Sequence, residues 1–484
     1  MSGPITYPAT HIYHLPDEIL NKILVFAVLG CSNSLLPLDI VSRNAITSVS
    51  KLWHSLAIDE PRIWSRICMN HIYSREDWRK ALRGFGAQPG MHPKNQAYLE
   101  RLPIWFSRSK DLLLDVTITF TNASEGVQND VKKVAWPYLG RCRSLNVSFY
   151  LDSSMAGSGF MVDNTFTWFP LPNMPHLDVL SICLVSGGRY QGTRIHLGPP
   201  LTLRQFELTG DTYPIFDSEI TAVDHLSLTD LNGHSVFKAL QHCPDVRQLT
   251  LQRTERPSPP FPPHLSFPSL EVLKVTSSLQ FPIEAAPNLK HLDCFSCHDP
   301  HQTYELVRDY EQCFSNLEIF AFCGLTVDTL RSIGNQSFIR SENLKAIISS
   351  WGSDPRTVIE FFSLPISPDA SYSPMTLTEG SVDRPFPALK LLVIDDIDFD
   401  LSVWHSSSGS LVDNLEGMLG ARPELVLYCV SPNPRKAVTS TVLEFARRMG
   451  GRFVITHSRP HLDADESVEQ CIWRFTHGRL QFGN

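Results

Sequence analysis

The sequence has no long hydrophobic run and no concentration of positive charge. Its longest apolar stretch, residues 23–30 (ILVFAVLG), is far shorter than the ~20 residues that a membrane-spanning helix requires. No basic segment with a small-residue cleavage site precedes this stretch, so we expect no signal peptide. The formal net charge is −8, and Lys and Arg form no run. The charge pattern therefore argues against nucleic acid and acidic membrane surfaces as partners.

Cysteine is scattered along the chain and forms no recognisable framework. The chain has 11 cysteines, an odd number, without a secretory signal. This usage predicts reduced, mostly buried thiols, because disulfides belong to oxidising compartments. We therefore expect a cytoplasmic or nuclear protein.

Motifs that carry chemistry are also missing. There is no G-x-S-x-G elbow, no P-loop, no dinucleotide fingerprint and no H-E-x-x-H pair. We expect no enzymatic activity, no cofactor and no metal. An unrecognised enzyme site is the remaining alternative, and it would have to use the histidines and acids at 455–470.

Two short motifs resemble ligand sites but have simpler explanations. Residues 294–301 (CFSCHDPH) fit the C-x-x-C-H pattern of haem attachment and contain zinc-type ligands. Cys294, however, occupies an apolar strand position and is expected to be core. Residues 395–400 (DDIDFD) lack the glycine and distal glutamate of a calcium loop, so we expect a solvated loop.

The N-terminal region predicts a small group of helices. In residues 14–24 (HLPDEILNKIL), Pro16 suits a first helical turn and two acids follow at the positive end of the helix dipole. Large aliphatic residues then recur at helical spacing up to Gly30. A second helix is predicted over 42–58, followed by a short apolar turn at 59–64 (DEPRIW). So small a unit buries little surface, so we expect its apolar stripe to contact something else as well.

These three blocks together resemble an F-box of the fungal F-box-like type. They read L-P-x-E-I-L-x-x-I-L from Leu15, V-S-K-x-W-x-x-L-A from Val49, and P-x-I-W from Pro61. The resemblance implies that this region binds a Skp-type adaptor and, through it, a cullin ubiquitin ligase. The segment 31–41 departs from the family by its length. The residues predicted to bind the partner or to support the binding face are Leu15, Pro16, Ile19, Leu20, Ile23, Leu24, Val49, Trp53, Leu56, Ile63 and Trp64. The alternative is a plain helical hairpin packed on the next domain.

The body of the chain repeats a short phrase of the form x-L-x-x-L-x-L. Nine copies have their middle apolar residues at Leu180, Phe206, Leu226, Leu249, Leu273, Leu292, Phe320, Ile347 and Leu392. Successive spacings are 26, 20, 23, 24, 19, 28, 27 and 45, mostly within or near the period of leucine-rich repeats. The last gap could hold an insertion at 365–385. Each phrase alternates like a strand with one buried face, so neighbouring repeats must supply the other wall. A non-repeat α/β domain with recurring strands is the alternative.

The predicted fold class is α/β. We expect an F-box-like helical domain at 10–70, a helical linker at 71–110, a degenerate leucine-rich-repeat solenoid at 111–460 and a tail at 461–484. The predicted function is substrate recruitment to a Skp–cullin–F-box ubiquitin ligase, with an unknown protein target bound by the repeats. The alternative is a protein-binding scaffold unconnected to ubiquitin.

Overall fold

The computed structural model describes the chain in segments. The described residues are 15–29, 45–69, 93–121, 123, 125–151, 171–186, 193–196, 203–210, 212–215, 220, 223–254, 265–276, 286–294, 316–323, 341–350, 359, 362, 386–395, 411–430, 440–456 and 470. They fall into two compact units, Met1–Val223 and Asp224–Asn484. The division falls inside the region predicted as one repeat domain; the predicted domain boundaries stay a prediction.

The first unit begins with short helices. Helix α1 spans Asp17–Leu29, and its first hydrogen bonds go to the Pro16 carbonyl, from the Ile19 and Leu20 amides at 3.0 Å each. Pro16 therefore stands just outside the helix, one position before the turn predicted for it. Helix α3 spans Lys51–Asp59, and α4 is a single turn at Pro61–Trp64.

The single helix predicted over 42–58 is wrong. Residues 45–49 are helical, but Ser50 is extended (φ −162°) and its side chain accepts a hydrogen bond from the Trp53 amide at 3.2 Å. A serine at this place caps a new helix, because its side chain satisfies one of the first-turn amides that have no partner within the helix. The helical spacing of apolar residues continues across Ser50. Periodicity alone therefore predicted one helix where the structure has two.

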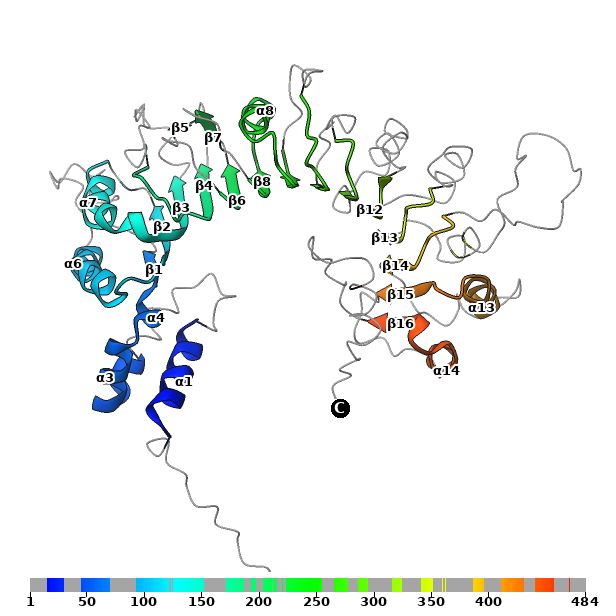
Figure 1. Cartoon of the computed structure of the whole chain (residues 1–484), viewed down its shortest axis with the longest axis horizontal. Helices are drawn as coiled ribbons and strands as arrows, with labels where there is room; N and C mark the ends of the chain where they lie inside the picture. The colour runs from blue at the N-terminus through cyan, green and yellow to red at the C-terminus, as the bar shows by residue number, and fades with distance from the viewer. Residues whose placement is uncertain are drawn as a thin grey trace, which may run out of the picture. The chain divides into compact units, whose positions relative to one another are not determined.

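A parallel sheet of five strands follows within the first unit (Figure 1). Its order is β1 (Arg66–Met69), β2 (Leu114–Thr121), β3 (Cys142–Leu151), β4 (Val179–Ser186) and β6 (Gln205–Gly210). Strand β1 lies inside the region predicted to be helical, which is a correction. The helices of this unit are α6 (Pro93–Arg108) and α7 (Glu125–Ala135), with a 3₁₀ turn η2 at Trp136–Arg141. Strands β5 (Thr193–His196) and β7 (Thr212–Ile215) form a separate parallel pair.

The second unit contains nine parallel strands in chain order. They are β8 (His225–Thr229), β9 (Gln248–Gln252), β10 (Val272–Val275), β11 (His291–Cys294), β12 (Ile319–Cys323), β13 (Ala346–Ser350), β14 (Leu391–Asp395), β15 (Val426–Val430) and β16 (Phe453–Thr456). Its helices are α8 (Gly233–His242), α13 (Leu411–Ala421) and α14 (Ser440–Met449), with a 3₁₀ turn η6 at Gly450–Arg452.

The nine predicted middle residues of the repeats all lie on strands, and within each unit they are register partners. Leu180 pairs with Phe206 in the first unit. In the second unit the partners run without a slip from Leu226 to Leu392, and Leu427 of β15 continues the row. A one-residue slip would turn each apolar set to the other face, so the register is fixed by the pattern. Parallel strands in chain order are typical of a solenoid-like α/β fold.

Buried side chains of the strands form the core, which includes most described cysteines. Cys142, Cys243, Cys294 and Cys429 are buried as free thiols, whereas Cys68 and Cys183 are half-buried. Burial raises the pKa of Cys142 and Cys243 to about 12, so both stay protonated near neutral pH. Within the described part of the chain, no group of three or more His, Cys, Asp or Glu is placed to hold a metal ion.

Several predicted features lie outside the described residues. They are the linker between the first two helices at 31–41, the rest of the C-x-x-C-H motif after Cys294, the insertion at 365–385, the acidic residues 396–400 and the histidines at 457–461.

Candidate partner-binding surface of the N-terminal helices

Helix α1 has two apolar faces with different surroundings. Leu20, Leu24 and Val28, spaced four residues apart, are 0–1% exposed and form the inner face. Leu15, Ile19 and Ile23 are 38–40% exposed, and Phe26 is 77% exposed. A soluble helix normally presents polar residues outward, so a second apolar face is unusual.

The neighbouring residues 45–59 add to this outer surface. Val49 is 53% exposed and Leu52 is 37% exposed. Trp53 and Leu56 are half-buried, and Ala57 is fully buried between the helices. Contiguous exposed apolar side chains mark interaction sites more often than scattered ones do. We call the set Leu15, Ile19, Ile23, Phe26, Val49 and Leu52 the outer apolar surface.

Trp64 ties the small helices to the next segment instead of facing outward. Its indole Nε1 donates to the Ala57 carbonyl at 2.8 Å, and its ring centroid lies 6.5 Å from that of Trp105 on α6. The Arg108 guanidinium lies 4.7 Å above the Trp64 ring. Ile63 and Trp64 are 1% and 3% exposed. Both therefore support the surface from inside.

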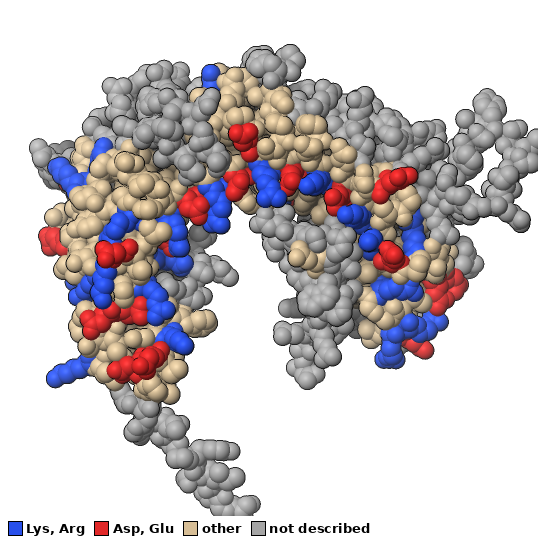
Figure 2. All heavy atoms as spheres, in the orientation of Figure 1, with Lys and Arg blue, Asp and Glu red and all other residues tan. Residues whose placement is uncertain are grey.

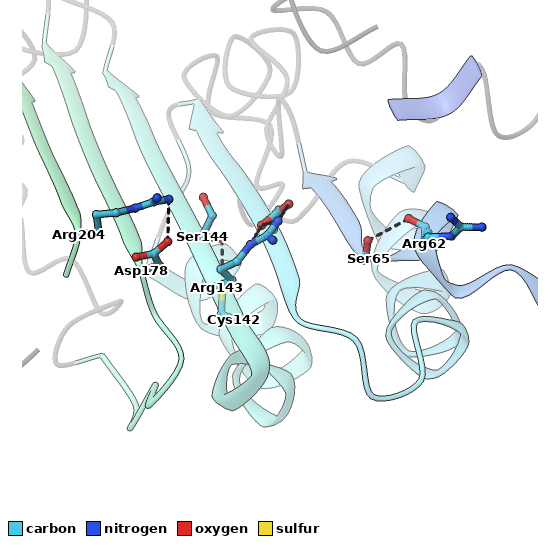
Figure 3. Close-up of polar contacts among 8 residues, drawn as sticks. Arg62, Ser65, Cys142, Arg143, Ser144, Asp178 and Arg204 are labelled. Atoms are coloured by element: carbon cyan, nitrogen blue, oxygen red, sulfur yellow. Dashed lines mark hydrogen bonds and ion pairs between the residues drawn. The ribbon is translucent and has the colours of Figure 1, made fainter. Parts of the chain in front are cut away.

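Glu60 fixes the turn into α4. Its carboxylate accepts from the Arg62 amide at 3.2 Å and from the Arg62 side chain at 2.7 and 2.8 Å. The Arg62 hydrogen bond lowers the pKa of Glu60, and burial opposes that effect. Ser65 then donates to the Arg62 carbonyl at 2.9 Å (Figure 3). These bonds hold the last turn of the helical region against the start of β1.

The structure thus sorts the predicted partner-binding residues into two groups. Exposed members are Leu15, Pro16, Ile19, Ile23 and Val49, and members buried or half-buried within the helical region are Leu20, Leu24, Trp53, Leu56, Ile63 and Trp64. Sequence reasoning missed Phe26 and Leu52, which are exposed as well. The sequence did indicate Phe26, because it lies three positions after Ile23 and so on the same side of the helix.

A second feature that the sequence interpretation missed is a row of charges at the strand starts. The residue two positions before each middle residue is Asp178, Arg204, Asp224, Arg247, Glu271, Lys290, Glu318, Lys345 and Lys390. The sign alternates through the first eight. We call these residues, with Asp115 and Arg143 at the starts of β2 and β3, the charge ladder.

Neighbouring members of the charge ladder form ion pairs within each unit. In the first unit Arg143 pairs with Asp115 at 2.7 Å and Arg204 with Asp178 at 2.9 Å (Figure 3). In the second unit Glu271 pairs with both Arg247 and Lys290, and Glu318 with Lys345. Acidic and basic side chains are accordingly interspersed on the face seen in Figure 2. Charges of opposite sign therefore alternate from Asp178 to Lys345, whereas Lys390 repeats the sign of Lys345 and lies 3.7 Å from Glu424.

The strand face opposite the main core carries one polar register row in β8–β11, beside a row in which Gln248, Val272 and His291 are buried. Ser227, Thr250, Lys274 and Asp293 are half-buried register partners on successive strands. Hydroxyl, ammonium and carboxylate groups in one row supply both donors and acceptors. We call this row the polar strand face.

Comparison with known families assigns the N-terminal region. Residues 12–70 match the F-box-like family. No curated protein matches the chain. The matched residues contain the outer apolar surface and all three sequence blocks on which the resemblance was based. The F-box-like domain therefore comprises α1, α3, α4 and β1. None of the helices that the structure describes is both long and apolar enough to cross a membrane.

Proposed function

We propose that the chain is a substrate-recruiting subunit of a Skp–cullin–F-box ubiquitin ligase. In this role the F-box-like domain binds a Skp-type adaptor, which links it to a cullin, and the repeats bind a protein target. The chain performs no covalent chemistry of its own. It raises the effective concentration of the target near the ubiquitin-carrying enzyme.

The observation that carries the proposal is the outer apolar surface on the F-box-like domain. Interfaces of stable complexes take most of their energy from a few large side chains near their centre. Ile19, Ile23 and Phe26 are exposed on the same helix whose inner face is already satisfied. Their exposure is explained if a partner helix covers them, because burying each such side chain contributes about 1.5–3 kcal/mol.

We propose that the polar strand face binds the target protein. Half-buried polar side chains in a regular row suit hydrogen bonding to a polypeptide. The interspersed charges in Figure 2 fit a protein target better than nucleic acid, which calls for a basic stripe. The cytoplasm or nucleus, where such ligases act, is the proposed location.

The alternative is a repeat scaffold in which the F-box-like domain only caps the body. The contact of Trp64 with Trp105 and Arg108 favours this alternative, because it buries part of the domain against α6. Deleting the whole F-box-like domain would not distinguish the adaptor-binding proposal from the scaffold alternative. Strand β1 pairs with β2, so its loss would expose a strand edge and cause aggregation under either hypothesis. Point variants on the outer face avoid that problem.

The test is the binding of purified Skp-type adaptor to the full chain by calorimetry. Ile19→Asp with Ile23→Asp should abolish adaptor binding without lowering the melting temperature by more than a few degrees, because both side chains are partly exposed and the buried inner face of α1 is left intact. Leu443→Asp is the matched control: Leu443 is 44% exposed on α14, in the other unit, and its replacement should leave adaptor binding unchanged. Undiminished binding by the double variant, or no binding by the unaltered chain, would overturn the proposal and leave the scaffold.

A further inference from the structure

The sheet of the first unit has a polar face opposite its main core. On the main-core face Val116, Leu145, Leu180 and Phe206 are buried register partners. Side chains of one strand alternate between faces, so the residues that follow them lie on the opposite face. Two register rows of that opposite face read Thr117, Asn146, Ser181, Glu207 and Thr119, Ser148, Cys183, Thr209. We call these eight residues the hydroxyl face.

The hydroxyl face is partly accessible and ends at two exposed apolar side chains. Its members are half-buried, except Ser148, which is 8% exposed. Tyr150 and Val185 are register partners one row further along β3 and β4, and they are 40% and 43% exposed. Tyrosine is enriched among the few side chains that dominate protein interfaces, because its ring is large and its hydroxyl can hydrogen-bond. Tyr150 and Val185 therefore form an apolar contact point beside a polar surface.

Glu207 is the one charged member of the hydroxyl face, and no described basic side chain neutralises it. Both acids of the charge ladder in this unit, Asp115 and Asp178, pair with an arginine. Glu207 instead accepts a hydrogen bond from Gln205 Nε2 at 2.7 Å, and among the described residues it forms no ion pair. A carboxylate that loses its water is costly unless a cation or several donors replace that water. A partner that covers this face must therefore bring a positive charge to Glu207.

The spacing of the two contact points suits an extended polypeptide. Glu207 is the register partner of Ser181, which lies four residues before Val185 on β4, and Tyr150 lies on the strand beyond β4. At about 3.3 Å per residue along a strand and about 4.8 Å between strands, the acid and the apolar pair are roughly 14–16 Å apart. An extended chain covers that distance in about four to five residues, and its backbone can hydrogen-bond the hydroxyl and amide groups in between. Nucleic acid suits this face poorly, because none of its eight members is Lys or Arg.

We propose that the hydroxyl face, together with Tyr150 and Val185, binds an extended basic segment of another protein. The segment places Lys or Arg against Glu207 and a large apolar side chain, about four to five positions away, against Tyr150 and Val185. This surface belongs to the first unit and is separate from the polar strand face of β8–β11. The proposal stands whether or not the F-box-like domain binds an adaptor.

A phage library of random dodecapeptides, panned on the immobilised full chain, tests the proposal. Selected peptides should share a Lys or Arg about four to five positions from a large apolar residue. By fluorescence anisotropy, a selected peptide should bind the Glu207→Lys variant at least tenfold more weakly than the unaltered chain. The same peptide with its basic residue replaced by Glu should instead prefer Glu207→Lys at least tenfold, which a misfolded variant could not produce. Peptides without a shared basic residue, or a reversed peptide that does not prefer Glu207→Lys, would overturn the proposal.

Matched variants in the other unit separate a local contact from general attraction to an acidic chain. Glu444 is exposed on α14, so Glu444→Lys makes the same change of charge and should leave the affinity of the selected peptide within about twofold. Tyr150→Ala should weaken the peptide about tenfold, whereas Leu443→Ala, at a position 44% exposed on α14, should not. Equal losses for Glu207→Lys and Glu444→Lys would show that the peptide responds only to the net charge of −8, and would contradict the proposal.

Discussion

The Glu271 carboxylate lies 2.9 Å from the Lys290 ammonium, across the gap between two successive strands. Both residues immediately precede their strands, and the Glu271 carbonyl also accepts the Lys290 and His291 amides at 2.9 Å each. Arg247 approaches the same carboxylate from the preceding strand at 2.8 Å. Side-chain ion pairs of the charge ladder thus link the same neighbouring strands that the backbone hydrogen bonds link.

Glu271→Gln should lower stability in a pH-dependent way. The Lys290 hydrogen bond lowers the pKa of Glu271 below its ordinary value of 4.5; burial opposes this effect and Arg247 adds to it. A carboxyl group whose pKa is lowered on folding stabilises the fold above its unfolded pKa, and that contribution is lost as pH falls through the folded pKa. We expect a loss of about 0.5–1 kcal/mol at pH 7, the size typical of partly exposed ion pairs, and less in high salt. Urea unfolding at pH 7 and pH 3 measures it.

Glu424→Gln is the control for Glu271→Gln. Glu424 is 75% exposed and lies 3.7 Å from Lys390, so Glu424→Gln should change the free energy of unfolding by less than about 0.5 kcal/mol. A Glu271 effect that persists unchanged at pH 3 would show that the loss comes from packing and not from charge.

Gly210→Ala should destabilise the first unit strongly. Gly210 ends β6 with φ +94°, and a Cβ there would lie 1.5 Å from the Leu184 carbonyl oxygen of β4. Leu184 and Gly210 are register partners, so the clash falls on the backbone of a neighbouring strand, which cannot move aside as a side chain would. We expect a loss of roughly 2–4 kcal/mol, at the high end for one substitution. Thermal unfolding measures it.

Gly140→Ala is the matched change for Gly210→Ala. A Cβ at Gly140 would meet only the Asn173 carbonyl oxygen, at an ordinary 3.9 Å, and its φ is not in the left-handed region. Its effect should stay within about 1 kcal/mol, in either direction, because replacing glycine also restricts the unfolded chain. Equal losses for the two variants would mean that the close approach at Leu184 is relieved at little cost.

The strand pattern could be predicted because a parallel repeat leaves few choices. Each strand must bury the same face as its neighbour, so the apolar residues from Leu180 to Leu392 had to recur in register. The charge ladder could have been found by the same alignment, since it lies two positions before every middle residue. It was overlooked because charges between apolar residues usually mean only a solvated position.

The surface of the F-box-like domain was less predictable. Ile19 and Leu20 are adjacent and chemically alike, yet one is 40% exposed and the other 1%. Only the position of α3 and α4 decides which side of α1 faces inward, and that is a tertiary effect. Strand β1 was missed for the same reason: four residues after Trp64 become a strand because β2, distant in sequence, supplies the partner.

Two tryptophans in the F-box-like domain should respond differently to the same substitution. Trp64→Phe removes the indole donor to the Ala57 carbonyl at 2.8 Å and leaves that carbonyl buried without its partner. Trp53 Nε1 is also buried, but it has no hydrogen-bond partner within the described part of the chain. A buried polar atom without a partner lowers the free energy of unfolding, so Trp53→Phe removes an unfavourable group. We expect Trp64→Phe to lower the free energy of unfolding by about 1–3 kcal/mol more than Trp53→Phe, although both lose the same volume. Urea unfolding of the full chain, followed by the fluorescence of the remaining tryptophans, measures the difference. A Trp53→Phe variant that loses as much as Trp64→Phe would show that the Ala57 hydrogen bond adds nothing beyond the contacts of the ring, and that the domain is held to α6 by packing with Trp105 and Arg108 alone.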